Sequence, residues 1–268
     1  MVKLGFIMAF NEVDWIGYAI DQATEICDRV IISEGSQFTS FPNIPARSND
    51  GTLDIISDKT KEYPNFITVS PSSRASGNYR HNQCANFNRA LSTCSIGDYF
   101  IPLDVDEYYS DSFLDEINTL TSLRIADHLT GQGHLYGFSF NWRIVFGDNP
   151  IWKKDILFKV VPSFKFTPTH KPKGQGKNKI ISLENNIYHY TWVKPASRMK
   201  IRMQTSSFYP GMPKWFENNW NKIELIDGKP QQSHKGVTLT LNKYNGTHPS
   251  VLDSHPWRYI NDIRWTTE

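Results

Sequence analysis

The chain has 268 residues, of which 39% are hydrophobic and 13% aromatic, and its net charge is +2. This composition can build a hydrophobic core and excludes a disordered chain. The charge is uneven, because residues 1–150 hold 10 basic and 19 acidic side chains, whereas residues 151–268 hold 19 basic and 8 acidic ones. Two interpretations fit: two halves that attract each other, or an acidic half for a metal and a basic half for phosphates.

Nothing in the sequence indicates a membrane or a secretory route. No run approaches the ~18 consecutive apolar residues of a membrane-spanning helix, and the N-terminus lacks the pattern of a signal peptide. Cys27, Cys84 and Cys94 lie far apart and in no metal-binding spacing, so they are predicted to be reduced thiols. We therefore expect a soluble, cytoplasmic protein without a transmembrane segment.

The first ~110 residues alternate between apolar runs of strand length and segments with helical periodicity. The predicted strands cover 3–10, 29–33, 65–70 and 98–103, and the predicted helices cover 15–26, 52–63 and 78–93. Asn11 is predicted to cap the first helix. Strand–helix–strand order predicts an α/β fold with a Rossmann-like, mostly parallel central sheet flanked by helices.

Beyond Gly131 the pattern changes to a smaller mixed region. Strands are predicted there at 134–146, 156–161 and 185–193, and helices at 196–207 and 215–226; a further helix, predicted at 111–123, precedes this region. Residues 168–179 form a Lys/Gly/Pro loop, either a solvated loop or a lid over a diphosphate. The hydrophobic residues of the last forty positions show no clear helical or strand periodicity.

Polar side chains follow three of the first four predicted strands. These are Asn11 with Glu12, then Glu34, then Asp104 with Asp106. In a parallel sheet these strand ends share one edge, where ligands bind. In an extended segment the two aspartates point to the same side, an arrangement that suits Mg²⁺ or Mn²⁺. An isolated Asp-x-Asp is more typical of a solvated turn or of helix caps, but its place after an apolar strand and opposite two other polar strand ends favours the site.

The order of four motifs resembles that of family-2-like glycosyltransferases with the GT-A fold. The motifs, which span about residues 3–110, are "FIMAFNEVDWIGYAI", "RVIISEGS", "GNYRHNQCANFNRAL" and "GDYFIPLDVDEYY". "IYHYTWVKP" (187–195) is similar to a late motif of small bacterial and viral members. The resemblance implies a metal-dependent enzyme that transfers a sugar, with inversion, from a nucleotide-diphosphate sugar to a glycan or other hydroxyl acceptor.

The resemblance also implies roles for single residues and segments. Residues 1–110 would be the nucleotide-sugar-binding half, 111–207 the acceptor and catalytic half, and 208–268 a C-terminal extension. Glu107 would buttress the site, and "SEGS", where the family more often has Asp-Asp-Gly-Ser, leaves the nucleotide open. The implied donor-binding residues are Ala9, Asn11, Glu12, Glu34, Arg80, Asp104 and Val105. The implied ligands of Mn²⁺ or Mg²⁺ are Asp104, Asp106 and His189.

An inverting transfer needs a general base for the acceptor hydroxyl, expected from the second half. Asp148 is the first candidate, and Asp155 and Glu184 are alternatives, although each alone also fits a surface carboxylate. Aromatic side chains of the second half are interpreted as an acceptor platform or as core. These side chains are Trp142, Trp152 and Trp192.

Three other functions are less well matched by the sequence. A nucleotidyltransferase-like enzyme typically carries a Gly-rich basic loop after its first strand, and "AFNEVDW" is not such a loop. A non-catalytic carbohydrate-binding protein needs aromatic side chains but no paired acids at a strand end. Nucleic acid is not expected as a partner, because the basic second half contains no recognisable binding motif.

Overall fold

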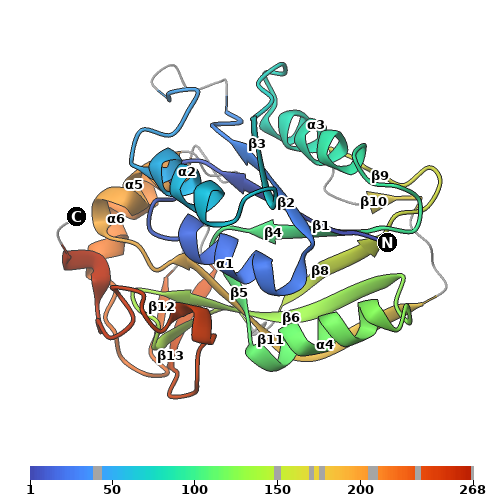
Figure 1. Cartoon of the computed structure of the whole chain (residues 1–268). Coiled ribbons are helices and arrows are strands. Elements are labelled where there is room, and N and C mark those ends of the chain that lie inside the picture. Colours follow the sequence, from blue (N-terminus) through green and yellow to red (C-terminus); the bar gives the residue numbers. More distant parts are fainter. Residues whose placement is uncertain are drawn as a thin grey trace. The chain divides into compact units, whose positions relative to one another are not determined.

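The computed structural model describes residues 1–38, 44–147, 152–168, 172–174, 179–204, 211–232 and 237–266 (Figure 1). The chain forms two compact units, and each is built from separate stretches of sequence. The first unit comprises Met1–Gly131 with Lys154–Asn185, and the second comprises Gln132–Lys153 with Asn186–Glu268. The prediction of a donor half, an acceptor half and a C-terminal extension concerns function and stays a prediction.

A parallel sheet is the centre of the first unit. Its strands lie in the order β4-β1-β2-β3 and are joined by parallel pairing, and β8 adds an antiparallel strand beside β4. Their bounds are β1 Lys3–Ala9, β2 Arg29–Glu34, β3 Ile67–Pro71, β4 Tyr99–Asp104 and β8 Trp152–Lys159. This arrangement confirms the predicted α/β class with a mostly parallel sheet. The prediction succeeded because the short apolar runs of the sequence form the buried strands.

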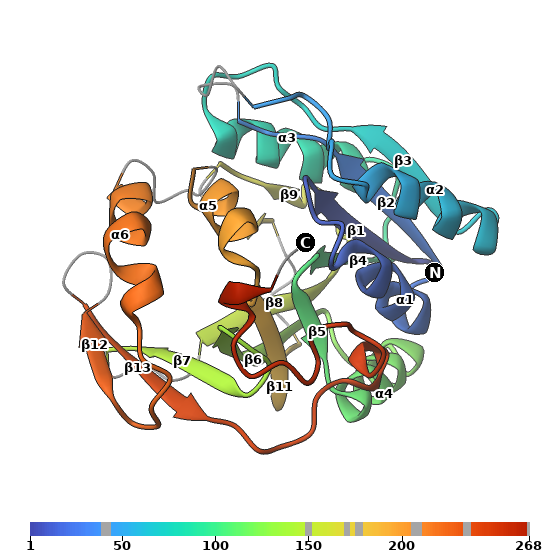
Figure 2. The same ribbon diagram turned by 90° about the vertical axis from the view of Figure 1, so that its left-hand side faces the viewer.

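Helices cover both faces of this sheet. Leu4 and Phe6 lie on one face of β1 and pack with Phe87 of α3. On the other face Gly5 lies so close to Cys27, just after α1, that a Cβ atom would be 2.8 Å from the sulfur. Figure 2 shows α3 and α1 on opposite sides of β1. The helices are α1 Ile16–Ile26, α2 Thr52–Glu62, α3 Tyr79–Leu91 and α4 Asp111–Ser122.

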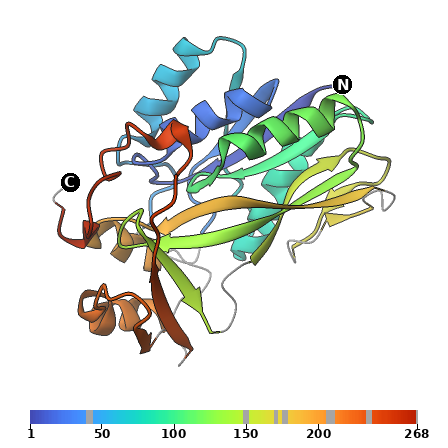
Figure 3. The ribbon, with the colours of Figure 1, turned by 90° about the horizontal axis from the view of Figure 1, so that it is seen from below.

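Three short strands complete the described part of the first unit, and two long strands extend beyond it. The short ones are β5 Glu107–Tyr109 and the pair β9 Lys165–Phe166 with β10 Pro172–Lys173. Two long strands, β6 His128–Gly137 and β11 Ile180–Trp192, pair with each other and continue into the second unit (Figure 3). None of the described helices is long and apolar enough to span a membrane.

The second unit has an antiparallel sheet and a helical layer. Its strands follow the order β12-β13-β7-β6. The elements are β7 Trp142–Phe146, β12 Pro230–Gln232, β13 Thr238–Lys243, α5 Ala196–Gln204, α6 Gly211–Asn219, and the 3-10 turns η1 Trp220–Lys222, η3 Ser250–Leu252 and η4 Ile263–Trp265. The single strand predicted at 134–146 is wrong, because the chain turns after Phe138, whose φ is 65°, and returns as β7. The helix predicted at 215–226 is also wrong, since α6 ends at Asn219.

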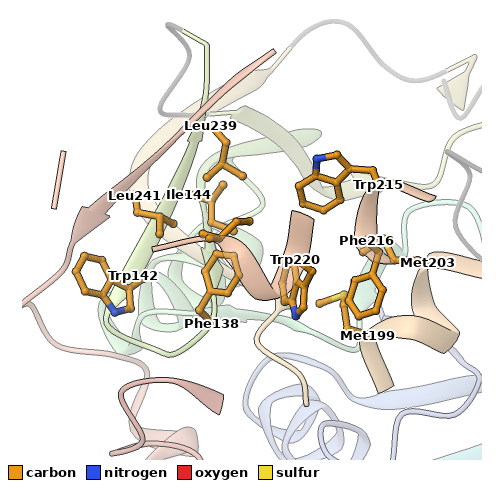
Figure 4. Close-up of a cluster of buried hydrophobic side chains, with 11 residues drawn as sticks. Phe138, Trp142, Ile144, Met199, Met203, Trp215, Phe216, Trp220, Leu239 and Leu241 are labelled. Carbon is orange, nitrogen blue, oxygen red and sulfur yellow. The ribbon is translucent and has the colours of Figure 1, made fainter. Parts of the chain in front are cut away.

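Figure 4 shows the hydrophobic cluster of the second unit. Trp220 is fully buried at its centre, with its ring 4.4 Å from that of Phe138 and 5.4 Å from that of Trp192. Trp142 is 5% exposed and belongs to the same cluster. Trp142 and Trp192 are therefore core residues rather than an acceptor platform, and the side chain of Trp152 lies outside the described part of the structure.

We predict that Trp220→Ala lowers the free energy of unfolding by about 3–5 kcal/mol, the usual loss for a large buried aromatic side chain. Urea unfolding followed by far-UV circular dichroism measures this loss. The matched control is Trp265→Ala, because that side chain is 64% exposed and its removal should change stability by less than about 0.5 kcal/mol. Equal losses for the two variants would contradict the assigned core.

Candidate functional site

The carboxyl ends of three parallel strands meet at one edge of the first unit. The register pairs Ala9 of β1 with Glu34 of β2, and Met8 of β1 with Asp104 of β4. The polar residues that follow these strands are therefore neighbours, as the sequence predicts. This edge is where open α/β sheets bind their ligands.

Asn11 joins the end of β1 to a loop that follows β2. Its backbone N–H donates to Ser48 Oγ at 2.9 Å, and its side-chain oxygen accepts from the N–H of Asn49 at 3.1 Å. Its φ is 55°, a left-handed conformation that asparagine tolerates well. The prediction that Asn11 caps the first helix is wrong, because the chain makes a turn here and α1 begins later.

Ala9 and Glu12 are both buried at this edge, with 2% and 8% of their surface exposed. The N–H of Glu12 donates to Oγ1 of Thr52 at 2.8 Å, and Thr52 is the first residue of α2. Hydrogen bonds from both Asn11 and Glu12 thus hold the loop after β1 against the segment 46–52.

Glu34 is fully buried and also holds that segment. Its Oε1 accepts from the N–H of Ser48 at 2.8 Å, and its Oε2 accepts from Arg47 Nε at 3.1 Å. Gly35 follows with φ +117°, and a Cβ atom there would lie 2.4 Å from the carbonyl oxygen of Ala46. Glu34 therefore positions the loop through two protein partners. A direct contact between Glu34 and a nucleotide stays a prediction.

Arg80 lies exposed in the first turn of α3. Its N–H donates to the capping side chain of Asn78 at 2.9 Å, and its Nε donates to the hydroxyl of Tyr79 at 3.0 Å. The Tyr79 ring stacks on Phe38 with centroids 5.1 Å apart. A helix N-terminus with an exposed guanidinium favours negative charge.

The acidic stretch forms a tight turn rather than an extended strand. β4 ends at Asp104, Val105 and Asp106 form the turn, and β5 begins at Glu107. The prediction that Asp104 and Asp106 lie in one extended segment is therefore wrong, and their shared role as metal ligands stays a prediction. The Asp104 side chain is 49% exposed, whereas Asp106 and Glu107 are only 5% and 3% exposed. Val105 is buried.

Lys154 of β8 lies between two of these acids. The β4–β8 register pairs Tyr99 with Lys159, and continued along both strands it brings Lys154 opposite Asp104. Lys154 Nζ donates to Asp104 Oδ2 at 2.6 Å and also to Glu107 Oε2. Burial lowers the pKa of Lys154, but the charges of Asp104 and Glu107 more than offset this and raise it above its ordinary value. The amine therefore stays an ammonium group.

Buried polar groups fix the turn and β5. Gln22 of α1 donates to the carbonyl of Glu107 at 3.2 Å and accepts from the N–H of Tyr109 at 2.6 Å. The Tyr108 hydroxyl donates to the carbonyl of Val105 at 3.0 Å. Burial raises the pKa of the Tyr109 hydroxyl, although the charge of Lys154 opposes this effect. The carboxylates are therefore presented by a well-supported backbone.

The donor set of this turn fits a hard divalent cation. Asp104, Asp106 and Glu107 carry three negative charges against the single positive charge of Lys154, and carboxylates are ligands that Mg²⁺ and Mn²⁺ accept. No group of three or more His, Cys, Asp or Glu side chains is placed to hold a metal among the residues described. Two carboxylates are sufficient where phosphate oxygens complete the shell. His189 is half-buried on β11, in the second unit, and its role as a ligand stays a prediction.

The candidates for the general base lie in different surroundings. Asp155 Oδ1 accepts a hydrogen bond from His128 Nε2 at 2.7 Å. Because it follows Lys154 on β8, it points to the opposite face of that strand. Glu184 is exposed on β11, and Asp148 lies outside the described residues. The loop expected at 168–179 is described only at 168, 172–174 and 179, and its role as a lid stays a prediction.

Neither Lys154 nor Gln22 was predicted from the sequence. Lys154 falls outside the strand predicted at 156–161, whereas β8 begins at Trp152. Gln22 carries a recognisable signal, since it is a polar residue among the buried positions of α1. Its partner on β5 is 85 residues away.

We predict that Lys154→Met lowers the free energy of unfolding by about 3–5 kcal/mol, because it leaves the buried Glu107 carboxylate without its counter-ion. The double variant Lys154→Met/Glu107→Gln should recover most of this loss, since it removes both charges. Urea unfolding measures both variants. Lys159→Met is the matched control on β8, and it should cost less because this side chain is 31% exposed. A double variant no more stable than the single one would contradict the pairing.

We predict that Glu34→Gln lowers the free energy of unfolding by about 1–3 kcal/mol, because a buried charged acceptor of two hydrogen bonds is lost. Thermal and urea unfolding measure the change. Arg47→Gln should cost less than about 1 kcal/mol, since the Arg47 side chain is 64% exposed. The reverse order of the two losses would show that Glu34 does not hold the loop.

Comparison with known proteins gives a limited likeness. No family model and no curated protein matches the chain. Among solved structures, S. aureus TarS has a TM-score of 0.45 and 13% identity, over 81% of this chain and 42% of that chain. A shorter form, TarS 1–349, has a TM-score of 0.44 and 13% identity, over 76% and 64%.

A third similar structure is the mannosyltransferase PcManGT from Pyrobaculum calidifontis in complex with GDP-Man and Mn²⁺. Its TM-score is 0.34 and its identity 15%, over 47% of this chain and 34% of that chain. The chain thus spans less than two thirds of the length of each of these proteins. All the TM-scores are below 0.5, and we therefore base the functional proposal on the chain's own residues.

Proposed function

We propose that the chain is a glycosyltransferase of the GT-A type, which moves a sugar from a nucleotide-diphosphate sugar to a hydroxyl acceptor such as a glycan, with inversion. The observation that carries this proposal is the acidic turn at Asp104–Glu107, at the carboxyl edge of a parallel sheet and beside the ends of β1 and β2. The order of the sequence motifs supports the same reaction. A sheet edge of this kind is the usual ligand site of open α/β folds.

The neighbouring loops suit the nucleoside part of the donor. Ala9, Asn11 and Glu12 lie at the end of β1, and the segment 46–52 is hydrogen-bonded to this loop and to Glu34. In this proposal Glu34 acts mainly by holding that segment, which forms the wall for the base and ribose. Arg80 supplies an exposed positive charge for a phosphate.

The turn suits the diphosphate part of the donor. Asp104 and Asp106 would hold Mn²⁺ or Mg²⁺, and Val105 between them would line the donor site. When bound, such a cation neutralises the charge that develops on the leaving diphosphate. Lys154 and Gln22 keep Glu107 and β5 in place behind the two aspartates.

We predict that one of UDP, GDP or dTDP stabilises the protein in the presence of Mn²⁺ and much less in its absence. A ligand at 100 times its Kd adds about 2.7 kcal/mol to the free energy of unfolding. Thermal unfolding at increasing nucleotide concentration measures this effect. Once the nucleotide is identified, sugars linked to it are tested as donors in a transfer assay. If no nucleotide raises the melting temperature under either condition, the proposed function is wrong.

The variant Asp106→Asn tests whether the metal and the nucleotide bind at the acidic turn. It should abolish the metal-dependent part of the stabilisation while the protein without ligand still unfolds cooperatively. Asp115→Asn on the exposed side of α4 removes the same charge away from the turn and should behave like the unchanged protein. Undiminished stabilisation of Asp106→Asn would place the nucleotide elsewhere.

A further inference from the structure

A lysine side chain lies beside the carboxylates that the proposed function assigns as metal ligands. The Lys154 side chain is only 12% exposed, and its Nζ lies 2.6 Å from Asp104 Oδ2. The same ammonium group contacts Glu107. A divalent cation that approaches Asp104 therefore meets a carboxylate that already has a positive partner.

The two acids hold the ammonium group unequally. Glu107 is 3% exposed and lies on β5, which Gln22 fixes through two hydrogen bonds. A buried carboxylate depends on its counter-ion, so Lys154 stays with Glu107. The Asp104 side chain is 49% exposed, and water can replace its half of the contact at small cost. Asp104 is thus the partner that can change.

A buried hydroxyl lies on the same side of β5 as Glu107. Tyr109 is two residues further along the strand, so its side chain shares the face of Glu107. The ring is fully buried, and its hydroxyl has no hydrogen-bond partner within the described part of the chain. Buried donors are normally satisfied, and a buried water is the usual partner where the protein supplies none.

We propose that Lys154 competes with the divalent cation for Asp104, so that the protein binds the cation tightly only together with a nucleoside diphosphate. The inference rests on the proposed function. A cation placed alone beside the ammonium group is repelled by it. A diphosphate adds several negative charges and oxygen ligands, which neutralise both cations at once. The cation and the nucleotide therefore bind with strong positive coupling, and Lys154 is its source.

Mn²⁺ binding without nucleotide tests the proposal, with free Mn²⁺ measured by electron paramagnetic resonance. We expect the unchanged protein to bind Mn²⁺ weakly and Lys154→Gln to bind it at least about tenfold more tightly, because one nearby positive charge is removed. Adding the stabilising nucleoside diphosphate should tighten Mn²⁺ binding strongly in the unchanged protein and much less in Lys154→Gln. Lys159→Gln, which removes a charge from the same strand beside Asp127, should behave like the unchanged protein.

The double variant Lys154→Met/Glu107→Gln gives the same test in a protein without the unpaired buried carboxylate, and it too should bind Mn²⁺ more tightly. If neither variant gains affinity, or if the unchanged protein binds Mn²⁺ equally well with and without nucleotide, the competition is wrong. Stabilisation of the unchanged protein by nucleotide and Mn²⁺ would then leave the proposed function standing. If no protein binds Mn²⁺ or nucleotide at all, both proposals fail.

Discussion

The parallel pairing of β1 with β2 and β4 is the constraint on which the rest of the first unit depends. Hydrogen bonds between the strands fix their register, and the register places Ala9 beside Glu34 and Met8 beside Asp104. Residues as far apart in sequence as Met8 and Asp104 are thereby brought to one edge of the sheet. The chemistry of the edge then depends on what each loop carries.

The acidic turn is stable because its charges are distributed between interior and solvent. Glu107 is buried and paired with Lys154, while Asp104 keeps half of its side chain in water. Transfer of an unpaired carboxylate into the interior is strongly unfavourable, which explains why a lysine of β8 is placed opposite the end of β4. The same pairing reduces the net negative charge of this edge.

The fold of the first ~110 residues could be predicted because its signals are local. Apolar runs of strand length, helical periodicity and the acids after β4 are all visible within a few residues of one another. The conformation of Asn11 was not predictable in the same way, because asparagine suits both a helix cap and a left-handed turn. Lys154 could not be assigned, since its partners depend on the pairing of β8 with β4, which no local pattern encodes.

Beyond Gly131 local signals were weaker. The β6–β7 hairpin turns at Phe138, a residue that carries no turn signal of the Gly, Pro or Asn type. The short strand β13 is stabilised by packing Leu239 and Leu241 into the cluster around Trp220, a contact that its own sequence does not reveal.

The first unit is discontinuous in sequence, since it needs Lys154–Asn185 as well as Met1–Gly131. A truncated chain that stops after the acidic turn and α4 would keep all the recognisable motifs of the strand ends but lose β8, and with it the cation that neutralises Glu107. Modular exchange of this N-terminal segment between proteins, by recombination or by design, must therefore carry β8 along. The stretch 132–153, which separates its two parts, is free to vary only where it leaves that strand in register.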